Sequence, residues 1–529
     1  MASLAEHLPR ALVERGIDTA FAVPGRSTVS FYPGLVGSAL RHISARSEVA
    51  AGFMADGYAR ATGRPAAVFA ASGPGMNSLS VSLRTALNAS TPLLALCVVD
   101  SDGRAGLCDP EARSGANDAP SAFAASTHKV AAPGDLFIAL DEAMDTFATR
   151  RPGPICIDIP RSIMEGEAGG GVPAPRRVAE PAPASAAELA EIVMRLDAAQ
   201  RPLVVLGGGA LAMTPQQATA LAERLKAPVI LTSNARGMIA PQHPLLVRAP
   251  IASAPVQALI AAADAALAIG VGFSTREWGA RFEHACFAPD ALIRIDIDAD
   301  RLSQPPAPAS ALCGPAAPTV AQLMLSLAPH DRAPADLAPA AQAAVATMPC
   351  RIARHRPLVE AIWEHLPSAV LVGDVTEPAH FGLAALVAPG PRRWWCSASG
   401  YGAPGYALPA AIGAKIGEHR RPVVALAGDR GVLYTIAELS SAIDARAPVI
   451  LIVWNNSGDA QMREALLAAR LKPDDFETIA VDFQALARGY GAFYQRVSGP
   501  AFFRDALREA MSRQLPTLLE LREEFWFAE

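Results

Sequence analysis

Residues 41–63 of the chain read RHISARSEVAAGFMADGYARATG. The first part, Arg41 to Arg46, predicts a short strand, and Glu48 opens a long helical run that ends at Gly63. Because a strand that leads directly into a helix is the repeating unit of an open parallel sheet, this stretch predicts an α/β fold. Such sheets bind ligands at the carboxyl ends of their strands, which is where Glu48 lies.

Apolar runs of strand length alternate with helix-length segments along the whole chain. They are Thr19–Val23, Ala66–Ala70, Leu93–Val99, Ile155–Ile159, Leu203–Leu206, Val229–Leu231, Ala265–Ile269, Val370–Val372, Val423–Leu426 and Val449–Trp454. The runs show no regular polar alternation, which is typical of parallel strands covered on both faces. The predicted fold class is therefore α/β, with three successive doubly wound domains and mostly parallel sheets.

The length of the chain favours several domains. A chain of 529 residues is too long for one hydrophobic core, and about three domains are expected. Two stretches of low complexity, at 166–187 and 329–348, lack apolar periodicity and predict linkers. They leave predicted domains at 1–165, 188–328 and 349–529, each near the usual domain size.

Composition excludes several classes of protein. The net charge of −5 is mild and no block of Lys or Arg occurs, so we expect neither nucleic acid nor a membrane surface as a partner. We expect no secretory signal, because no basic and apolar leader opens the chain, and no apolar run reaches the ~18 residues that span a bilayer. The seven cysteines are scattered without a CxxC pair, which argues against zinc and disulfides and favours the cytoplasm.

Two further motifs lie far from Glu48. Gly428-Asp429-Arg430 follows one apolar run, and Asn455-Asn456 follows the next. Together with Glu48 they resemble the thiamine-diphosphate (ThDP) enzymes of the acetolactate synthase and 2-oxo-acid decarboxylase superfamily. Within it the chain is most similar to the 2-ketoarginine (5-guanidino-2-oxopentanoate) decarboxylases, through residues 31–38, 52–60, 400–411 and 454–458.

The resemblance implies a role for each domain and an assembly. Residues 1–165 would bind the aminopyrimidine of ThDP, 188–328 would form a middle domain, and 349–529 would bind the diphosphate. The early Glu of the family, here Glu48, activates the aminopyrimidine, and burial raises a carboxyl pKa enough to make that proton exchange feasible near neutral pH. One subunit supplies the pyrimidine half of each site and another the diphosphate half, so we expect a homodimer or homotetramer with shared active sites.

The resemblance also implies a Mg²⁺ site at the diphosphate. A hard divalent cation takes oxygen ligands, and the family pattern assigns this role to Asp429, Asn456 and the backbone carbonyl of Gly458. Backbone N–H groups near Gly431, at the start of a helix predicted over 433–445, would face the diphosphate. This part of the predicted cofactor site comprises Gly428, Asp429, Arg430, Gly431, Asn456, Gly458 and Asp459.

Other loops resemble the remaining walls of the cofactor site. In the family, the loop matched by 400–411 lies beneath the cofactor and carries a bulky apolar residue that bends it; Pro404 stands at that position here. In the loop 373–377, Thr376 would bond a phosphate oxygen and Glu377 would point away. The predicted contacts from these loops and from the Gly-Pro-Gly turn near the pyrimidine are Gly73, Pro74, Asn77, Thr376, Gly402, Ala403 and Pro404.

Four positions depart from the family pattern, and one of them is Asp459, just past Asn455-Asn456. Arg430 replaces a usual Gly, and it could pair with the diphosphate, crowd the site or point to solvent. Pro404 is smaller than the usual wedge residue, and Ser47 precedes Glu48 where many relatives have His. A second hypothesis therefore stands beside catalysis, namely a catalytically altered or inactive homologue with a structural or regulatory role.

Three residues are candidates for contact with the substrate. Arg26 follows the first strand and favours a carboxylate. Asp459, predicted on the wall of the substrate cleft opposite Arg26, favours a substrate tail that is cationic or donates hydrogen bonds. His380 is a candidate acid/base group. The prediction is a polar 2-oxo acid rather than an aromatic or branched apolar one. The alternative is that Arg26 pairs with a neighbouring acid, Asp459 faces solvent and His380 is structural.

The middle segment carries a Gly-rich turn, Gly207-Gly208-Gly209, after a strand. It lacks the GxGxxG spacing of a dinucleotide-binding turn and a clear acidic partner. Although some members of the superfamily hold FAD near this domain, we expect none here.

Overall fold

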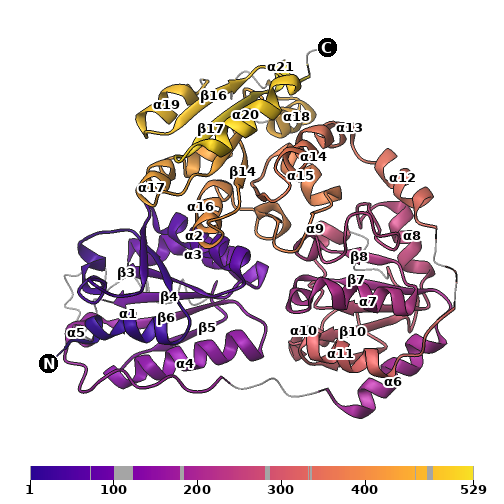
Figure 1. Cartoon of the computed structure of the whole chain (residues 1–529), viewed down its shortest axis with the longest axis horizontal. Coiled ribbons are helices and arrows are strands. Elements are labelled where there is room, and N and C mark those ends of the chain that lie inside the picture. The colour runs from indigo at the N-terminus through magenta and orange to yellow at the C-terminus, as the bar shows by residue number, and fades with distance from the viewer. Residues whose placement is uncertain are drawn as a thin grey trace.

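The computed structural model describes residues 2–71, 73–99, 123–178, 184–279, 286–331, 333, 336–458, 460–472 and 480–527. Three lobes, each built on one sheet, are arranged as a triangle (Figure 1). Every paired strand is parallel to its neighbour among the described residues. The predicted α/β fold class is confirmed.

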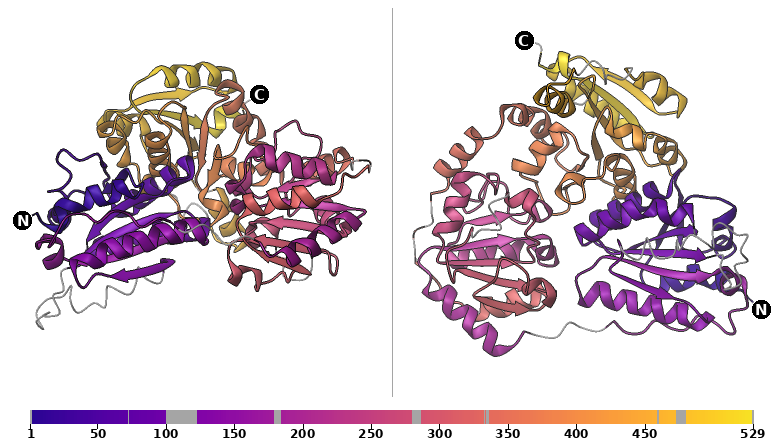
Figure 2. Two further views of the ribbon diagram at one scale, coloured as in Figure 1. Left: turned by 60° about the horizontal axis from the view of Figure 1, so that its bottom comes forward. Right: turned by 180° about the vertical axis from the view of Figure 1, so that it is seen from behind.

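The N-terminal lobe contains a six-stranded sheet in the order β2-β1-β3-β4-β6-β5. Its strands are β1 (Thr19–Ala22), β2 (Arg41–Ser44), β3 (Ala66–Ala71), β4 (Leu93–Val99), β5 (Ser126–Lys129) and β6 (Pro154–Pro160), and its helices are α1 (Leu4–Glu14), α2 (Glu48–Thr62), α3 (Pro74–Ala89), α4 (Pro133–Thr149) and α5 (Arg161–Glu165). Successive residues of β3 face opposite sides: Val68 packs in the cluster with α2 and α3, and Phe69 packs in the cluster with α1 and α4. Helices therefore cover both faces, as Figure 2 shows.

The C-terminal lobe repeats this topology, in the order β13-β12-β14-β15-β17-β16. Its strands are β12 (Val370–Gly373), β13 (Trp394–Cys396), β14 (Val423–Gly428), β15 (Ile450–Asn455), β16 (Phe493–Val497) and β17 (Thr517–Arg522). Its helices are α13 (Cys350–Ala353), α14 (Arg356–His365), α15 (Glu377–Ala385), α16 (Ala407–Gly417), α17 (Glu438–Asp444), α18 (Ala460–Ala468), α19 (Phe483–Gly489), α20 (Pro500–Ser512) and α21 (Glu523–Trp526). In this repeat α16 corresponds to α2, since each follows the second strand of its sheet.

The middle lobe has a five-stranded sheet in the order β11-β10-β9-β7-β8. Its strands are β7 (Pro202–Leu206), β8 (Val229–Leu231), β9 (Ala265–Ile269), β10 (Leu292–Asp296) and β11 (Ser310–Cys313), and its helices are α6 (Ala186–Ala198), α7 (Pro215–Leu225), α8 (Ala254–Ala262), α9 (Thr275–Trp278), α10 (Ala299–Leu302) and α11 (Ala316–Ser326). The middle sheet reverses its strand order once, at β7/β9, whereas the N- and C-terminal sheets reverse it at β1/β3 and β12/β14 and again near one edge, where β6 and β17 lie inside β5 and β16. Open α/β sheets bind ligands at such reversals.

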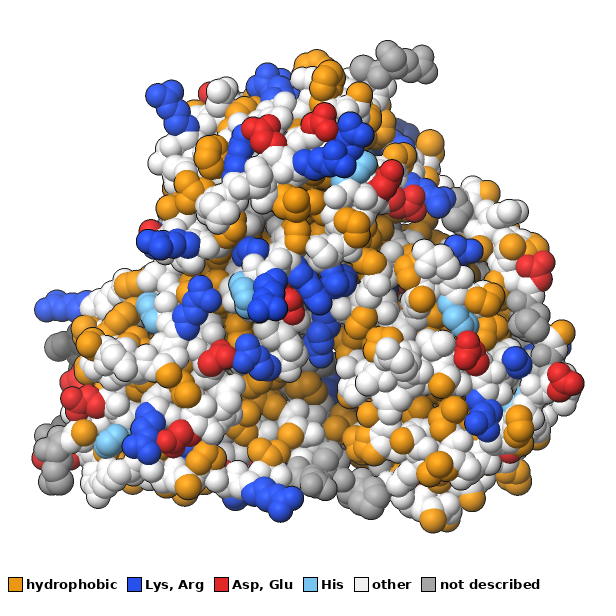
Figure 3. Space-filling view, viewed as in Figure 1, with side chains coloured by type: hydrophobic (Ala, Val, Ile, Leu, Met, Phe, Trp, Pro, Cys, Tyr) orange, Lys and Arg blue, Asp and Glu red, His pale blue; other side chains and the backbone are white. Residues whose placement is uncertain are grey.

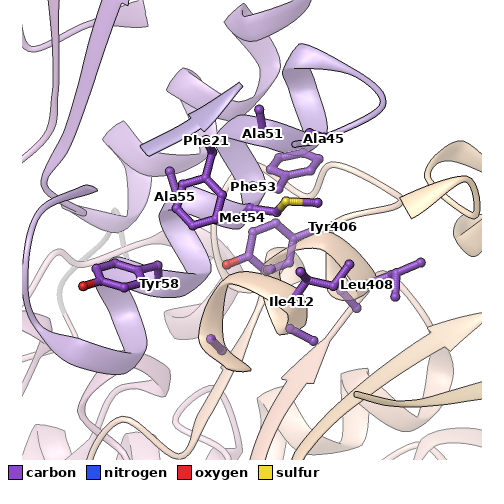
Figure 4. Packing of buried hydrophobic residues seen from close by; sticks show 14 of the residues in the cluster. Phe21, Ala45, Ala51, Phe53, Met54, Ala55, Tyr58, Tyr406, Leu408 and Ile412 are labelled. Carbon is purple, nitrogen blue, oxygen red and sulfur yellow. The ribbon is translucent and has the colours of Figure 1, made fainter. Parts of the chain in front are cut away.

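The N- and C-terminal lobes join where α2 crosses α16. A Cβ on Gly57 would lie 1.9 Å from the carbonyl oxygen of Ala410, and one on Gly413 would lie 1.8 Å from that of Met54. The two backbones are therefore in contact, and glycine is required at both positions. Around the crossing, one hydrophobic core continues from the first lobe into the third (Figure 4).

Two sequence predictions of local structure need correction. The helix predicted over 433–445 is shorter, because a 3-10 turn, η7 (Gly431–Tyr434), precedes α17, which begins only at Glu438. The predicted linker 329–348 contains a helix, α12 (Ala338–Ala346), whose Ala344 is buried. Its alanines give little apolar contrast between faces, so periodicity did not reveal it. Among the described residues, no helix is both long and apolar enough to cross a bilayer.

Candidate active site

The reversal of strand order at β12/β14 in the C-terminal sheet brings two predicted cofactor loops together. Thr376 caps α15 just after β12, and Gly428 ends the neighbouring strand β14. A Cβ on Gly428 would lie 3.3 Å from the Thr376 hydroxyl oxygen. Thr376 and Gly428 therefore lie side by side, as expected of two diphosphate-contacting loops.

The predicted metal ligands gather at the carboxyl ends of β14 and β15. The backbone N–H of Asp429 donates to the Trp454 carbonyl (3.0 Å), and that of Gly458 donates to Oδ2 of Asp429 (3.1 Å). Asn456 lies between Trp454 and Gly458 on the same turn. The fold thus brings the Asp429 carboxylate beside a turn that carries an amide and a backbone carbonyl, and such hard oxygen donors suit a divalent cation.

The preceding residue, Asn455, has a different role. Its side-chain amide donates to Glu520 on β17 (2.7 Å), and its amide oxygen accepts the backbone N–H of Ser457 (3.0 Å). Glu520 is buried and also accepts from Tyr494. The Asn-Asn pair is therefore divided: Asn455 fixes the turn, and Asn456 is the candidate ligand.

Burial raises the pKa of Asp429 to about 6, although the Arg430 charge and the Gly458 N–H act in the opposite direction. The side chain is only 8% exposed, so its ionised form lacks the solvation it would have in water. A cation bound at this point would stabilise the ionised carboxylate in place of water. The protein residues therefore fit the predicted metal, and Arg430 itself is half-buried beside Asp429.

The loop 402–405 is held from several directions. Gly402 and Gly405 have φ values of +78° and +79°, which favour glycine. The Thr435 hydroxyl donates to the Gly405 carbonyl (2.7 Å). Within the loop Ala403 is buried, whereas Pro404, at the predicted wedge position, is exposed. The loop therefore presents Pro404 outward on a fixed backbone.

Glu48 lies at the other predicted half of the site. It is the first residue of α2, after the N-cap Ser47, and its Oε1 is 3.2 Å from where a Cβ on Gly75 would be. Gly75 is in the first turn of α3, whose N-cap Gly73 has φ +76° and whose first residue is Pro74. The carboxylate of Glu48 therefore faces the positive end of a 16-residue helix, which favours a negative charge. Asn77, in the same turn of α3, is exposed.

Within one chain, the two predicted halves of the cofactor site contact different ends of α3. Glu48 lies against Gly75, whereas a Cβ on Gly400 would lie 3.5 Å from Cβ of Asn88. These two residues of α3 are about 20 Å apart at 1.5 Å per residue. Glu48 and the start of the cofactor loop therefore do not touch within a single chain.

The predicted substrate residues are less closely grouped. Arg26 is exposed at the start of the 3-10 turn η1 (Arg26–Phe31), at the same sheet edge as Glu48 and Gly73. His380 is half-buried in α15, and burial lowers its pKa. Asp459 lies outside the described residues.

Sequence reasoning missed two side chains at the cofactor loop. Arg276, on α9 of the middle lobe, donates from Nη1 to the Ala398 carbonyl (3.2 Å), and Nη1 would lie 2.9 Å from a Cβ on Gly402. Because this contact joins distant parts of the chain, no local motif announces it. Asp374, at the end of β12, accepts the backbone N–H groups of Val375 (2.8 Å) and Ala407 (3.1 Å). It belongs to a quoted motif, but its role depends on the tertiary fold.

The side chain of Glu377 is bound by residues outside the predicted cofactor loops. It accepts from Nε2 of the fully buried His355 (3.2 Å) and from Arg354 (3.3 Å). These contacts attach the start of α15 to α13 and α14. Glu377 therefore serves to anchor the helix that Thr376 caps.

A cavity of about 480 Å³ lies between the N-terminal and middle lobes. It is lined by Gly208 and Gly209 after β7, by Gly270 after β9, and by Asp296 at the end of β10. Arg60, Arg150, Arg151, Arg301 and Arg392 add positive charge to its wall, and Figure 3 shows Lys and Arg side chains along this seam. Asp296 thus lines the same cavity as the Gly-rich turn, from a strand two places away in the sheet.

Comparisons with known proteins agree with this geometry. Family models of the thiamine pyrophosphate enzymes match in order: the N-terminal TPP binding domain at residues 2–116, the central domain at 189–323 and the C-terminal TPP binding domain at 376–521. The chain is 35% identical to "Probable 2-ketoarginine decarboxylase AruI" of Pseudomonas aeruginosa, over 97% of this chain and 93% of that protein. It is 28% identical to the acetolactate synthase isozyme 1 large subunit of Escherichia coli, over 98% and 93%. A thiamine diphosphate-dependent 4-hydroxybenzoylformate decarboxylase of Rhodococcus jostii shares the fold, with a TM-score of 0.80 at 22% identity over 98% of this chain and 99% of that one.

Proposed function

The chain belongs to the thiamine pyrophosphate enzyme family, and we propose that it is a ThDP- and Mg²⁺-dependent lyase or carboligase that acts on a polar 2-oxo acid. The observation that carries the proposal is the contact between Asp429 and the turn of Asn456 and Gly458, next to the adjacent residues Thr376 and Gly428. Bound ThDP supplies the electron sink for loss of the substrate carboxylate. In this proposal Asp429, Asn456 and Gly458 hold the metal.

The remaining chemistry belongs to the protein's own side chains. Thr376 and the N–H groups near Gly431 bind the diphosphate oxygens. Glu48 exchanges a proton with N1′ of the aminopyrimidine. Because Glu48 and the start of the cofactor loop do not touch in one chain, we further propose a homodimer or homotetramer in which Glu48 of one subunit completes the diphosphate half of another. We place this assembly in the cytoplasm, because its cysteines are scattered and the six in the described part of the chain are unpaired.

The proposed substrate class follows from the charged side chains predicted to contact the substrate. Arg26 supplies one guanidinium for a carboxylate, and Arg276, at the cofactor loop, supplies a second. Asp459 would select a cationic or donating tail. The name of the Pseudomonas relative supports a tail like that of 2-ketoarginine.

A substrate panel tests this proposal. With ThDP and Mg²⁺ present, we expect faster turnover of 5-guanidino-2-oxopentanoate than of benzoylformate or 2-oxoisovalerate. Assays of CO₂ release and of the carbon–carbon bonded product distinguish simple decarboxylation from carboligation. Faster turnover of either apolar substrate would defeat the proposed specificity.

The departures at Arg430, Pro404, Ser47 and Asp459 favour a second candidate, a ThDP-binding homologue without turnover. In that case calorimetry would detect cofactor binding, and the whole panel would give no product. The two candidates thus differ in turnover and not in affinity for ThDP.

A further inference from the structure

Tyr406 joins the cofactor loop to the first lobe. It directly follows Gly405, and it is fully buried in the core shared by the two lobes. Its ring packs edge-on against Phe53 of α2, with centroids 5.1 Å apart. The residue therefore stands at the point where the loop 402–405 becomes α16.

The backbone at Tyr406 is held by the buried carboxyl of Asp374. Ala407 donates its N–H to Asp374 (3.1 Å), and the N–H groups of Gly405 and Tyr406 also face this acceptor. Burial raises the pKa of Asp374 to about 6, and these N–H groups limit the rise. One end of the loop is thus fixed to the end of β12, next to Thr376.

The side chain of Tyr406 is held by a second buried carboxyl, from the other lobe. Its hydroxyl donates to Oδ2 of Asp56 on α2, and Asp56 is also paired with Arg60 (2.9 Å). Burial, reinforced by the Asp56 charge, raises the pKa of Tyr406 well above its usual range, so the hydroxyl remains a donor. Figure 4 shows this hydroxyl directed toward α2, while that of Tyr58 points away from the crossing.

We propose that Tyr406 is a positioning residue for the cofactor: by joining Asp374 of the third lobe to Asp56 of the first, it fixes the loop that supports ThDP. The inference rests on the proposed function, because that loop matters only if it lies beneath the cofactor. Loss of the hydroxyl leaves the Asp56–Arg60 pair in place and releases one tether. The loop then spends less time in the conformation that binds ThDP. The apparent affinity for ThDP falls in proportion to the fraction of protein in that conformation.

The test compares Tyr406→Phe with a matched control, Tyr58→Phe. Tyr58 lies on α2, the helix that carries Asp56, and in the same core as Tyr406, but its hydroxyl donates to Asp18 (2.6 Å), which lies before β1. Both variants lose one hydrogen bond to a carboxylate, Tyr58→Phe also loses the bond that its hydroxyl accepts from Arg64 (2.6 Å), and both are expected to unfold at somewhat lower temperature. ThDP is titrated calorimetrically in saturating Mg²⁺, below both unfolding transitions. We expect a Kd about tenfold higher for Tyr406→Phe and changed less than about twofold for Tyr58→Phe.

The outcomes separate the two claims. If the wild type does not bind ThDP, the proposed function fails; if it binds and the two variants have equal affinities, the positioning role fails. At saturating ThDP, the KM for the 2-oxo acid should be unchanged in Tyr406→Phe, and a raised KM with unchanged ThDP affinity would also overturn the inference. Should Tyr406→Phe prove insoluble, Asp56→Asn weakens the same bond from the other side, with Asp18→Asn as its control.

Discussion

Asp429 shows how one residue can oppose stability and serve binding. Its carboxyl is buried, its pKa is raised to about 6, and Gly458 donates one backbone N–H to it. The neighbouring Arg430 offsets part of the charge, which is a structural role that the family's usual Gly could not perform. An ionised carboxylate kept in such a place is typical of a site that awaits a cation.

The raised pKa of Asp429 predicts that the stability of Asp429→Asn, relative to the wild type, depends on pH. Because the folded pKa lies above the unfolded value of 3.8, the folded state binds more protons between these values, and stability falls as pH rises through roughly 4 to 6. At pH 8 the variant should therefore be more stable than the metal-free wild type by on the order of 1–3 kcal/mol. The gain should shrink at pH 5 and vanish near pH 4.

Thermal unfolding in EDTA, at the three pH values, measures this gain. In the same instrument Mg²⁺ with ThDP should raise the unfolding temperature of the wild type and leave Asp429→Asn unmoved. A variant that is less stable than the metal-free wild type at pH 8, or that is still stabilised by Mg²⁺ with ThDP, would refute this role for Asp429.

At the scale of elements, the crossing of α2 and α16 makes its own prediction. Gly57→Ala and Gly413→Ala each place a methyl within 2 Å of a backbone carbonyl oxygen, so the helices must separate. We expect a loss of about 3 kcal/mol or more, since overpacking against backbone cannot be relieved by rotamers. Gly134→Ala, in α4 with nothing within 4 Å, is the control and should be neutral or stabilising by up to about 1 kcal/mol. Urea unfolding measures all three, and equal stabilities would contradict the described crossing.

How far the sequence predicts a strand depends on how continuous its apolar run is. Central strands such as β4 and β14 are continuous apolar runs and were predicted within a residue or two. The edge strands β5 and β16 were missed because they are half-exposed and polar, and the edge strand β13 because it has only three residues. The buried interior strands β10 and β17 were missed as well, because Arg294 and Glu520 interrupt their apolar runs. Within the site, motif residues such as Asp429 could be predicted, whereas Arg276 reaches the loop from another lobe and leaves no local pattern.

At the scale of the whole molecule, the first and third sheets share one strand order although no internal sequence repeat was recognised. Their corresponding helices, α2 and α16, pack against each other. Each of the two helices begins at a predicted half of the cofactor site. Glu48 opens α2, and the loop 402–405 leads into α16. A pair of chains that exchanged these halves would form two equivalent sites, which is the symmetry usual for a homodimer.

The exchange rate of the thiazolium C2 proton of ThDP tests this shared site most directly, because it requires bound cofactor and a working Glu48 but no substrate. Glu48→Gln alone should bind ThDP within about tenfold of the wild type and exchange slower by orders of magnitude, as loss of an acid/base group does. Asp429→Asn alone should be equally slow, for want of bound cofactor. Co-expressed in equal amounts, the two variants should recover about a quarter of the wild-type rate, since half of randomly paired dimers carry one intact site of two. A mixture no faster than either variant would contradict the shared site, and an unchanged rate in Glu48→Gln would remove Glu48 from the mechanism.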